Sequence, residues 1–175
     1  MTAFVDTNVF IRHLTGDPAD QAARATAYLA SEDALLVTDL IVAETAYVLE
    51  SFYEAPRPQV AAALRSILSF PTVVTVEQSV LLRAVELYEV DRLDFAEAYL
   101  VACAESTGVA RVASFDRALD RIPTIERIQP GPLLPKARQW RPDVVTRRRA
   151  APSGRQSEDH RARPHVSMAV VDDGR

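Results

Sequence analysis

Cysteine is nearly absent from this chain, and long apolar runs are lacking altogether. Cys103 is the only cysteine in 175 residues, so one chain can form neither a disulfide nor a cluster of thiolate ligands. We expect Cys103 to fill space in the core. Apolar runs such as residues 40–43 fall far below the roughly 18 residues of a membrane span. The N-terminus lacks the basic stretch of a secretory signal, and we therefore expect a cytoplasmic protein without a transmembrane helix.

Basic charge is also scarce over most of the chain. Residues 1–135 contain 10 arginines and 19 acidic residues, a net charge of −9, whereas residues 136–175 contain 10 basic and 5 acidic residues, a net charge of +5. Broad binding to phosphates depends on basic side chains that displace counterions. The acidic part of the chain is better suited to binding cations.

Strand and helix patterns alternate along the acidic part. Short apolar or β-branched segments predict strands at residues 3–7, 35–37, 72–76, 110–114 and 124–128. Apolar periodicity predicts helices at residues 9–14, 17–29, 38–53, 58–68, 77–90 and 94–106, and one helical turn at 116–120. Asp17 is expected to cap the second helix, with Pro18 at its first position. Gly108 is expected to end the helix that precedes it.

This alternation predicts an α/β domain over residues 1–130, with a mostly parallel central sheet of about five strands flanked by helices. From residue 131 the composition changes, because proline and arginine become frequent and apolar periodicity is lost. We expect residues 131–175 to form a disordered tail, in which the run Arg147–Arg149 could attract RNA weakly.

Two acidic residues follow predicted strands. Asp6 comes directly after Phe4-Val5, and Asp116 follows the strand that ends near Ser114. Ligands of open α/β sheets bind beyond the carboxyl ends of the strands, so both carboxylates are candidates for one site. The alternative for each is a local role as the N-cap of the next helix.

Glu44 and Glu97 lie among apolar residues at helical spacing. Leu40 and Tyr47 flank Glu44, and Leu93 and Leu100 flank Glu97. A buried carboxylate without a partner is costly, and a bound cation would remove that cost. Glu44 could instead reach water from the end of its helix.

Asp94 lies one helical turn before Glu97, on the same face. The spacing of these two acids also fits a capping box, with Asp94 as the N-cap and Glu97 three residues on. The choice between a ligand pair and a local cap stays open for these residues.

The four acidic motifs together resemble the PIN domain, and more narrowly the VapC-type toxins of bacterial toxin–antitoxin pairs. The motifs are Phe4-Val5-Asp6-Thr7-Asn8, Val42-Ala43-Glu44, Asp94-Phe95-Ala96-Glu97-Ala98 and Ser114-Phe115-Asp116-Arg117. The resemblance covers about residues 1–130 and implies a three-layer fold. It implies metal-binding and catalytic roles for Asp6, Glu44, Asp94 or Glu97, and Asp116. It also implies that Asn8 and Ser114 support these acids through hydrogen bonds.

The activity that the resemblance implies is cleavage of RNA phosphodiesters with Mg²⁺ or Mn²⁺ as cofactor. It further implies a homodimer and a small cognate antitoxin that blocks the acidic crevice. The family pattern usually has Asp where this chain has Glu97, and commonly another Asp where it has Ala118. These two departures affect the metal geometry and a possible second metal site. Arg12, Arg117 and Arg121 could steer RNA, whereas His13 is expected at a helix end or on the surface.

Two other functions remain open. A non-catalytic PIN-like module would bind RNA or a protein, with a site weakened by Glu97 and Ala118. A haloacid-dehalogenase-like phosphohydrolase would also place an Asp after its first strand. That enzyme would show Asp where this chain has Asn8, and it would need a lysine within the domain, whereas the only lysine is Lys136.

Overall fold

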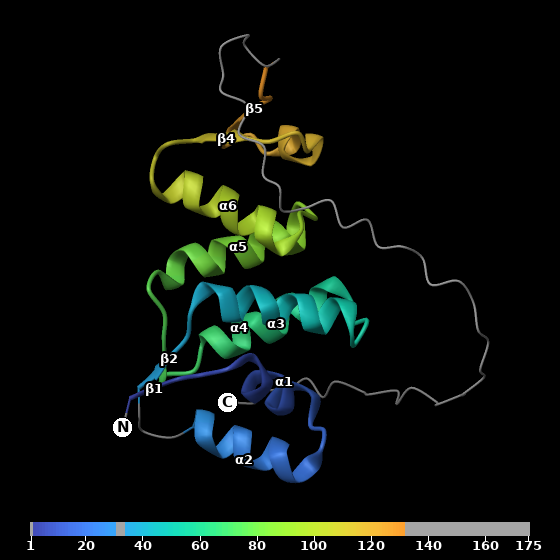
Figure 1. Cartoon of the computed structure of the whole chain (residues 1–175), viewed down its shortest axis with the longest axis vertical. Coiled ribbons are helices and arrows are strands. Elements are labelled where there is room, and N and C mark those ends of the chain that lie inside the picture. Colours follow the sequence, from blue (N-terminus) through green and yellow to red (C-terminus); the bar gives the residue numbers. More distant parts are fainter. Residues whose placement is uncertain (1, 31–33, 132–175) are drawn as a thin grey trace, which may run out of the picture.

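The structure is a computed structural model that describes residues 2–30 and 34–131. Helices and strands alternate along it (Figure 1). The strands are β1 (Ala3–Phe4), β2 (Leu35–Leu36), β3 (Val73–Val74), β4 (Arg111–Ala113) and β5 (Glu126–Ile128). The helices are α1 (Thr7–Thr15), α2 (Ala19–Leu29), α3 (Asp39–Ser51), α4 (Arg57–Leu68), α5 (Gln78–Val90), α6 (Phe95–Ser106) and the 3₁₀ helix η1 (Arg117–Arg121).

The predicted α/β class and the parallel strands are confirmed. β1 pairs with β2, β2 with β3, and β4 with β5, and all three pairings are parallel. The strands form two sheets, in the orders β1-β2-β3 and β4-β5, where the sequence predicts one sheet. Alternation of strands and helices predicts strand direction, but the pairing of distant strands depends on how the helices between them pack.

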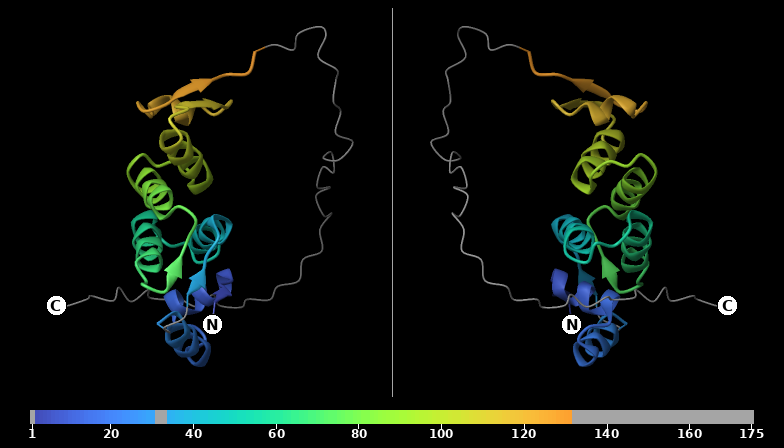
Figure 2. Two further views of the ribbon diagram at one scale, coloured as in Figure 1. Left: turned by 90° about the vertical axis from the view of Figure 1, so that its left-hand side faces the viewer. Right: turned by 90° about the vertical axis from the view of Figure 1, so that its right-hand side faces the viewer.

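Helices α3, α4, α5 and α6 stack between the two sheets (Figure 1). β1 and β2 lie with α1 and α2 toward one end, α3 and α4 follow, and α5 and α6 lead to β4 and β5 at the other end (Figures 1 and 2). The core runs through this stack. Its largest fully buried side chains include Phe10 of α1, Leu49 of α3, Leu64 of α4, Tyr88 of α5 and Leu119 of η1.

Helix boundaries agree with most of the local signals. The Thr38 hydroxyl accepts a hydrogen bond from the backbone N–H of Ile41 and caps α3. Gly108 has a positive φ of 69° and follows Thr107, the C-cap of α6, so a glycine ends this helix as the sequence predicts. The expected cap of α2 is wrong, because the helix begins at Ala19 and its N-cap is Pro18. The carbonyl of Asp17 instead accepts a hydrogen bond from Arg12.

The predicted tail falls almost wholly on residues 132–175, which lie outside the described residues. Within the part that is described, no helix is long and apolar enough to cross a membrane. Cys103 is half-buried and packs against the core.

Candidate active site

The first group of candidate residues lies where β1 leads into α1. Asp6 is exposed at the N-cap of α1, yet its carboxylate does not cap the helix. It accepts a hydrogen bond from the side-chain amide of Asn8. The capping alternative is therefore not observed for Asp6, and its second carboxylate oxygen stays available to a ligand.

Glu44 belongs to the same group through Thr7. The buried hydroxyl of Thr7 donates a hydrogen bond of 2.6 Å to Glu44 Oε2, and Thr7 directly follows Asp6. The expectation that Glu44 is buried is wrong, because its side chain is exposed and its helical neighbours Leu40 and Tyr47 are 75% and 68% exposed. The apolar residues around Glu44 thus form a surface, and the carboxylate needs no cation to compensate for burial.

Glu97 and Asp116 form the second group, between the start of α6 and the end of β4. Glu97 is half-buried and Asp116 is exposed. Burial raises the pKa of Glu97, as do the charge of Asp116 and a hydrogen bond between the two side chains. Two carboxyl groups in contact share a proton or attract a cation, since both cannot ionise without repulsion.

Asp94 adds negative charge beside this pair, and its charge also raises the pKa of Glu97. A capping box consists of two reciprocal hydrogen bonds, and one of them is present. The Glu97 side chain bonds to the backbone of Asp94, and this hydrogen bond lowers the pKa of Glu97. The other half is missing, since the Asp94 side chain makes no cap hydrogen bond. Asp94 is thus exposed and available beside the Glu97–Asp116 pair.

Asp116 is held by local hydrogen bonds at the end of β4. Its backbone N–H donates to the Ser114 hydroxyl at 3.0 Å, and its Oδ1 accepts from the backbone N–H of Ala118 at 2.7 Å. Asp116 therefore caps η1 and contacts Glu97 at the same time. One carboxylate can perform both tasks, because an ionised Asp has two oxygens with about four lone-pair sites.

The structure does not bring the two groups together. Asp6 begins α1 near the β1–β2 end, whereas Asp116 follows β4 at the opposite end (Figures 1 and 2). Within residues 2–30 and 34–131, no three His, Cys, Asp or Glu side chains are placed to hold one metal ion. A single ion shared by Asp6, Glu44 and Asp116 is therefore not a feature of this arrangement.

The donor chemistry of the second group nevertheless fits Mg²⁺ or Mn²⁺. Mg²⁺ prefers oxygen ligands and is commonly bound by one or two carboxylates, with water and substrate phosphate completing its shell. Glu97 and Asp116 supply two contacting carboxyl groups, and Asp94 lies close enough to affect the Glu97 pKa. Glu97 and Asp116 could hold one ion as a pair without Asp6 or Glu44, with Asp94 beside them rather than as a third ligand.

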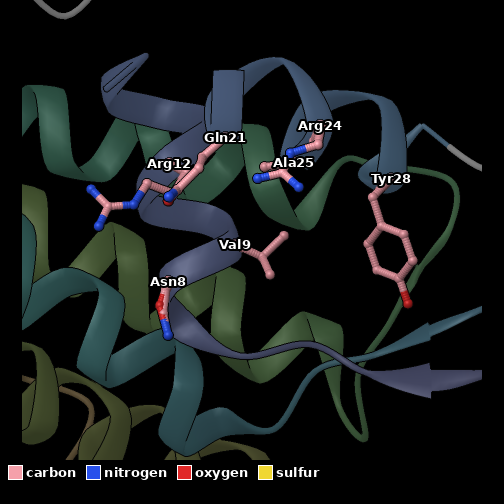
Figure 3. A pocket seen from close by; sticks show the side chains of 7 residues that line it. All are labelled: Asn8, Val9, Arg12, Gln21, Arg24, Ala25 and Tyr28. Carbon is pink, nitrogen blue, oxygen red and sulfur yellow. The ribbon is translucent and has the colours of Figure 1, made fainter. Parts of the chain in front are cut away.

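Basic residues lie near both groups. Arg12 lines a pocket of about 610 Å³ between α1 and α2, together with Asn8, Arg24 and Tyr28 (Figure 3). Arg117 and Arg121 are exposed on η1, directly after Asp116. His13 is half-buried, and burial lowers its pKa.

The sequence motifs did not single out two polar residues of the site region, Thr7 and Tyr99. Thr7 links the Asp6 segment to Glu44, and its position directly after a strand-end Asp was the available signal. Tyr99 of α6 donates a hydrogen bond to Asp39 of α3 and so connects the helices that carry Glu97 and Glu44. No spacing rule within one helix could have predicted this contact between residues 60 positions apart.

Comparison with known proteins identifies one family. The PIN domain family matches residues 3–125, which include both groups of acids. A comparison with curated proteins gave no match.

Proposed function

This chain belongs to the PIN domain family, whose membership indicates a nuclease in general, and we propose that it is a Mg²⁺- or Mn²⁺-dependent endoribonuclease. One observation carries the proposal. Glu97 and Asp116 come from different elements, and Asp116, which Ser114 and Ala118 hold in place, lies near enough to raise the pKa of Glu97. Such an arrangement is costly for folding alone, and its cost is offset when a cation binds.

In this proposal Glu97 and Asp116 would hold the ion, with the exposed Asp94 beside them. When bound, the divalent ion supplies positive charge that lowers the pKa of an attacking water and stabilises the pentacoordinate transition state. Glu97 would bind the ion in its ionised form, because a nearby positive charge favours the carboxylate. Arg117 and Arg121 lie next to Asp116 and attract the RNA phosphate.

Asp6 and Glu44, the first group, are also included in the proposed catalytic set. Both are exposed and both are oriented by a polar neighbour, Asn8 for Asp6 and Thr7 for Glu44. Since they lie apart from the Glu97–Asp116 pair, their contribution is tested separately. If Asp6→Asn and Glu44→Gln cleave RNA as fast as the unchanged protein, the site consists of the second group alone.

The central experiment measures cleavage of single-stranded RNA with Mg²⁺, with Mn²⁺ and with EDTA. Activity is expected with either ion and is expected to disappear with EDTA, with Glu97→Gln and with Asp116→Asn. Glu126→Gln is the matched control, because Glu126 is an exposed acid on β5 at the same end, with only an exposed ion pair to Arg111. Cleavage that survives EDTA and both site variants would refute the proposal.

A second candidate function is a PIN-like module that binds RNA or protein without catalysis. The separation of the two acidic groups and the presence of Ala118 favour it. Binding of RNA without cleavage under any divalent ion would support this module. The haloacid-dehalogenase-like alternative finds no support, because the family that matches is the PIN domain.

For its biological role, we propose the toxin of a toxin–antitoxin pair, acting in the cytoplasm as a homodimer. Support comes from the apolar surface of α3 and its C-terminal end, where Leu40, Tyr47 and Phe52 are 75%, 68% and 75% exposed. Such a surface suits a protein partner. Growth arrest on expression, relieved by a co-expressed small neighbouring gene, would support the role. A monomer whose expression has no effect on growth would contradict it.

A further inference from the structure

The pocket between α1 and α2 combines two guanidinium groups, an aromatic ring and an apolar floor. Arg12, Arg24 and Tyr28 supply the polar and aromatic side chains, and Val9 and Ala25 supply the floor. In Figure 3, Asn8 and Arg12 mark one end of the pocket and Tyr28 marks the other. Its volume of about 610 Å³ falls within the roughly 300–1,000 Å³ of sites that bind small molecules or single groups of a polymer.

The guanidinium groups are free to take up an anion. Arg12 uses Nη1 to donate to the Asp17 carbonyl at 2.9 Å, which leaves its other donors for a ligand. Arg24 pairs only loosely with Asp20, at 3.7 Å, and both side chains are about three-quarters exposed. An exposed ion pair of this kind contributes little free energy, so a phosphate can replace Asp20 without a large cost.

Tyr28 gives the pocket a surface for a nucleobase. Its side chain is 43% exposed and lines the pocket from the last turn of α2. Grooves that bind single-stranded nucleic acids combine basic side chains along the backbone with aromatic rings on which bases stack. The Arg12–Arg24–Tyr28 set has this composition.

The pocket is continuous with the first group of acids. Asn8 lines the pocket and donates a hydrogen bond to Asp6. We propose that this pocket binds one strand of RNA, with phosphates on Arg12 and Arg24 and a base stacked on Tyr28, and that it guides the strand toward Asp6. The inference rests on the proposed ribonuclease function and names the form of its substrate, a single strand with an unstacked base.

The test measures binding without cleavage. A short labelled single-stranded RNA of mixed sequence is titrated with the full chain in EDTA, and its fluorescence anisotropy is followed at several salt concentrations. Arg24→Gln is expected to weaken binding and to reduce the slope of log K against log salt by about 0.7, the value of one phosphate contact on a single strand. Tyr28→Leu is expected to weaken binding about five- to about a hundredfold without changing that slope.

Matched variants control for charge and for the ring. Arg111→Gln removes the same charge from β4, where Arg111 is exposed and pairs only with Glu126, and it should leave the affinity unchanged. Tyr28→Phe keeps the ring and should bind RNA like the unchanged chain. The RNA affinity of Arg12→Gln is interpreted together with its thermal melt, because Arg12 also donates a hydrogen bond to the Asp17 carbonyl and its loss could affect the fold.

Three results would overturn the inference. The first is unchanged RNA affinity in both Arg24→Gln and Tyr28→Leu. The second is equal affinity for the corresponding RNA duplex, whose stacked bases cannot reach Tyr28. The third is loss of a bound protein partner in these variants while RNA affinity persists, which would make the pocket a protein-docking site.

The experiments distinguish a failure of the proposed RNA binding in the pocket from a failure of the proposed ribonuclease function. RNA that binds through Arg24 and Tyr28 but is never cleaved with Mg²⁺ or Mn²⁺ would support the pocket and refute the nuclease. Metal-dependent cleavage with unchanged affinity in both variants would refute the pocket alone.

Discussion

Glu97 is a residue whose charge is unfavourable for the folded state and useful in the candidate active site. It is half-buried beside Asp116 and Asp94, and its raised pKa means that Glu97 binds a proton more readily in the folded chain than in the unfolded chain. The sequence predicted the helical face and the neighbouring Asp94 from spacing alone. It could not predict that Asp116, 19 positions later, would contact Glu97, since that contact depends on how β4 packs on α6.

We expect Glu97→Gln to stabilise the fold at neutral pH while reducing cleavage at least about tenfold. Because burial and Asp116 raise the pKa of Glu97 above its ordinary 4.5, the folded state binds more protons than the unfolded state between these two pKa values. The contribution of Glu97 to stability is thus fully present below pH 4.5 and is lost as the pH rises through its folded pKa. Thermal melts of the unchanged protein and of Glu97→Gln, from about pH 4 to about pH 8, measure the difference in Tm between the two proteins.

Addition of Mg²⁺ separates the two roles of Glu97. The ion should raise the Tm of the unchanged protein, since a ligand that binds only the folded state stabilises it. It should have a smaller effect on Glu97→Gln and its full effect on the control Glu126→Gln. A variant that is less stable than the unchanged protein at pH 7 would contradict the electrostatic account.

Thr7 carries a second prediction at this scale. It is only 6% exposed and donates to Glu44 at 2.6 Å. Thr7→Val keeps the shape but removes the donor, and we expect a loss of about 1 kcal/mol in the free energy of unfolding. Urea denaturation measures it, with Thr7→Ser as the control that keeps the hydroxyl. Equal stabilities of Thr7→Val and Thr7→Ser would show that the hydrogen bond does not matter to the fold.

At the scale of elements, periodicity and local signals predicted every helix and strand of the described residues within a few positions. β-Branched Val73 and Val74 lie in the predicted third strand, and Gly108 follows α6 with the positive φ that glycine tolerates. The cap of α2 was mispredicted because two adjacent residues, Asp17 and Pro18, both suit the start of a helix. In the structure the Asp17 carbonyl accepts a hydrogen bond from Arg12, a contact that the local signals do not contain.

The contact between α3 and α6 gives a prediction about element packing. The Tyr99 hydroxyl donates to Asp39 Oδ2, and this hydrogen bond is the largest cause of the raised Tyr99 pKa. Asp39 Oδ1 is buried and has no hydrogen-bond partner among the described residues, so Tyr99 supplies this carboxylate through Oδ2. Tyr99→Phe leaves this carboxylate without its donor, and we expect a loss of about 1–3 kcal/mol in the free energy of unfolding.

Urea denaturation measures the loss in the free energy of unfolding, and Tyr47→Phe on α3 is the matched control for Tyr99→Phe. Tyr47 is 68% exposed, so removal of its hydroxyl should change the stability little. The double variant Tyr99→Phe with Asp39→Asn should recover part of the loss, because the buried charge is removed as well. If Tyr99→Phe is as stable as Tyr47→Phe, the hydrogen bond does not hold α6 to α3.

At the scale of the whole molecule, side chains distant in sequence fix the end that carries Asp116. Arg83 of α5 donates to both oxygens of Glu105 in α6, at 2.7 and 3.1 Å, and Thr124 before β5 donates to the same carboxylate. This cluster joins α5, α6 and the β4–β5 end. The sequence predicted parallel strands but not their division into two sheets, because no local pattern contains the Arg83–Glu105–Thr124 contacts.

The charge asymmetry of the chain leads to a prediction about residues 132–175. All the buried apolar side chains of the described residues lie between Val5 and Ile122, so a chain that ends at Gly131 retains this core. We expect its Tm to equal that of the full chain. The truncation removes a net charge of +5 and leaves an acidic chain, so RNA binding should weaken and depend less steeply on salt.

Thermal melts and RNA titrations of the two lengths test the separate roles of core and charge. A full-length control in which Arg147, Arg148 and Arg149 are replaced by Gln should show part of the loss in RNA affinity and none in Tm. A lower Tm of the truncated chain would show that residues after Gly131 contribute to the core. Unchanged RNA affinity in both proteins would assign RNA binding to the acidic part of the chain, where Arg12, Arg24, Arg127 and the η1 arginines are among the exposed or half-buried cations near the candidate acids.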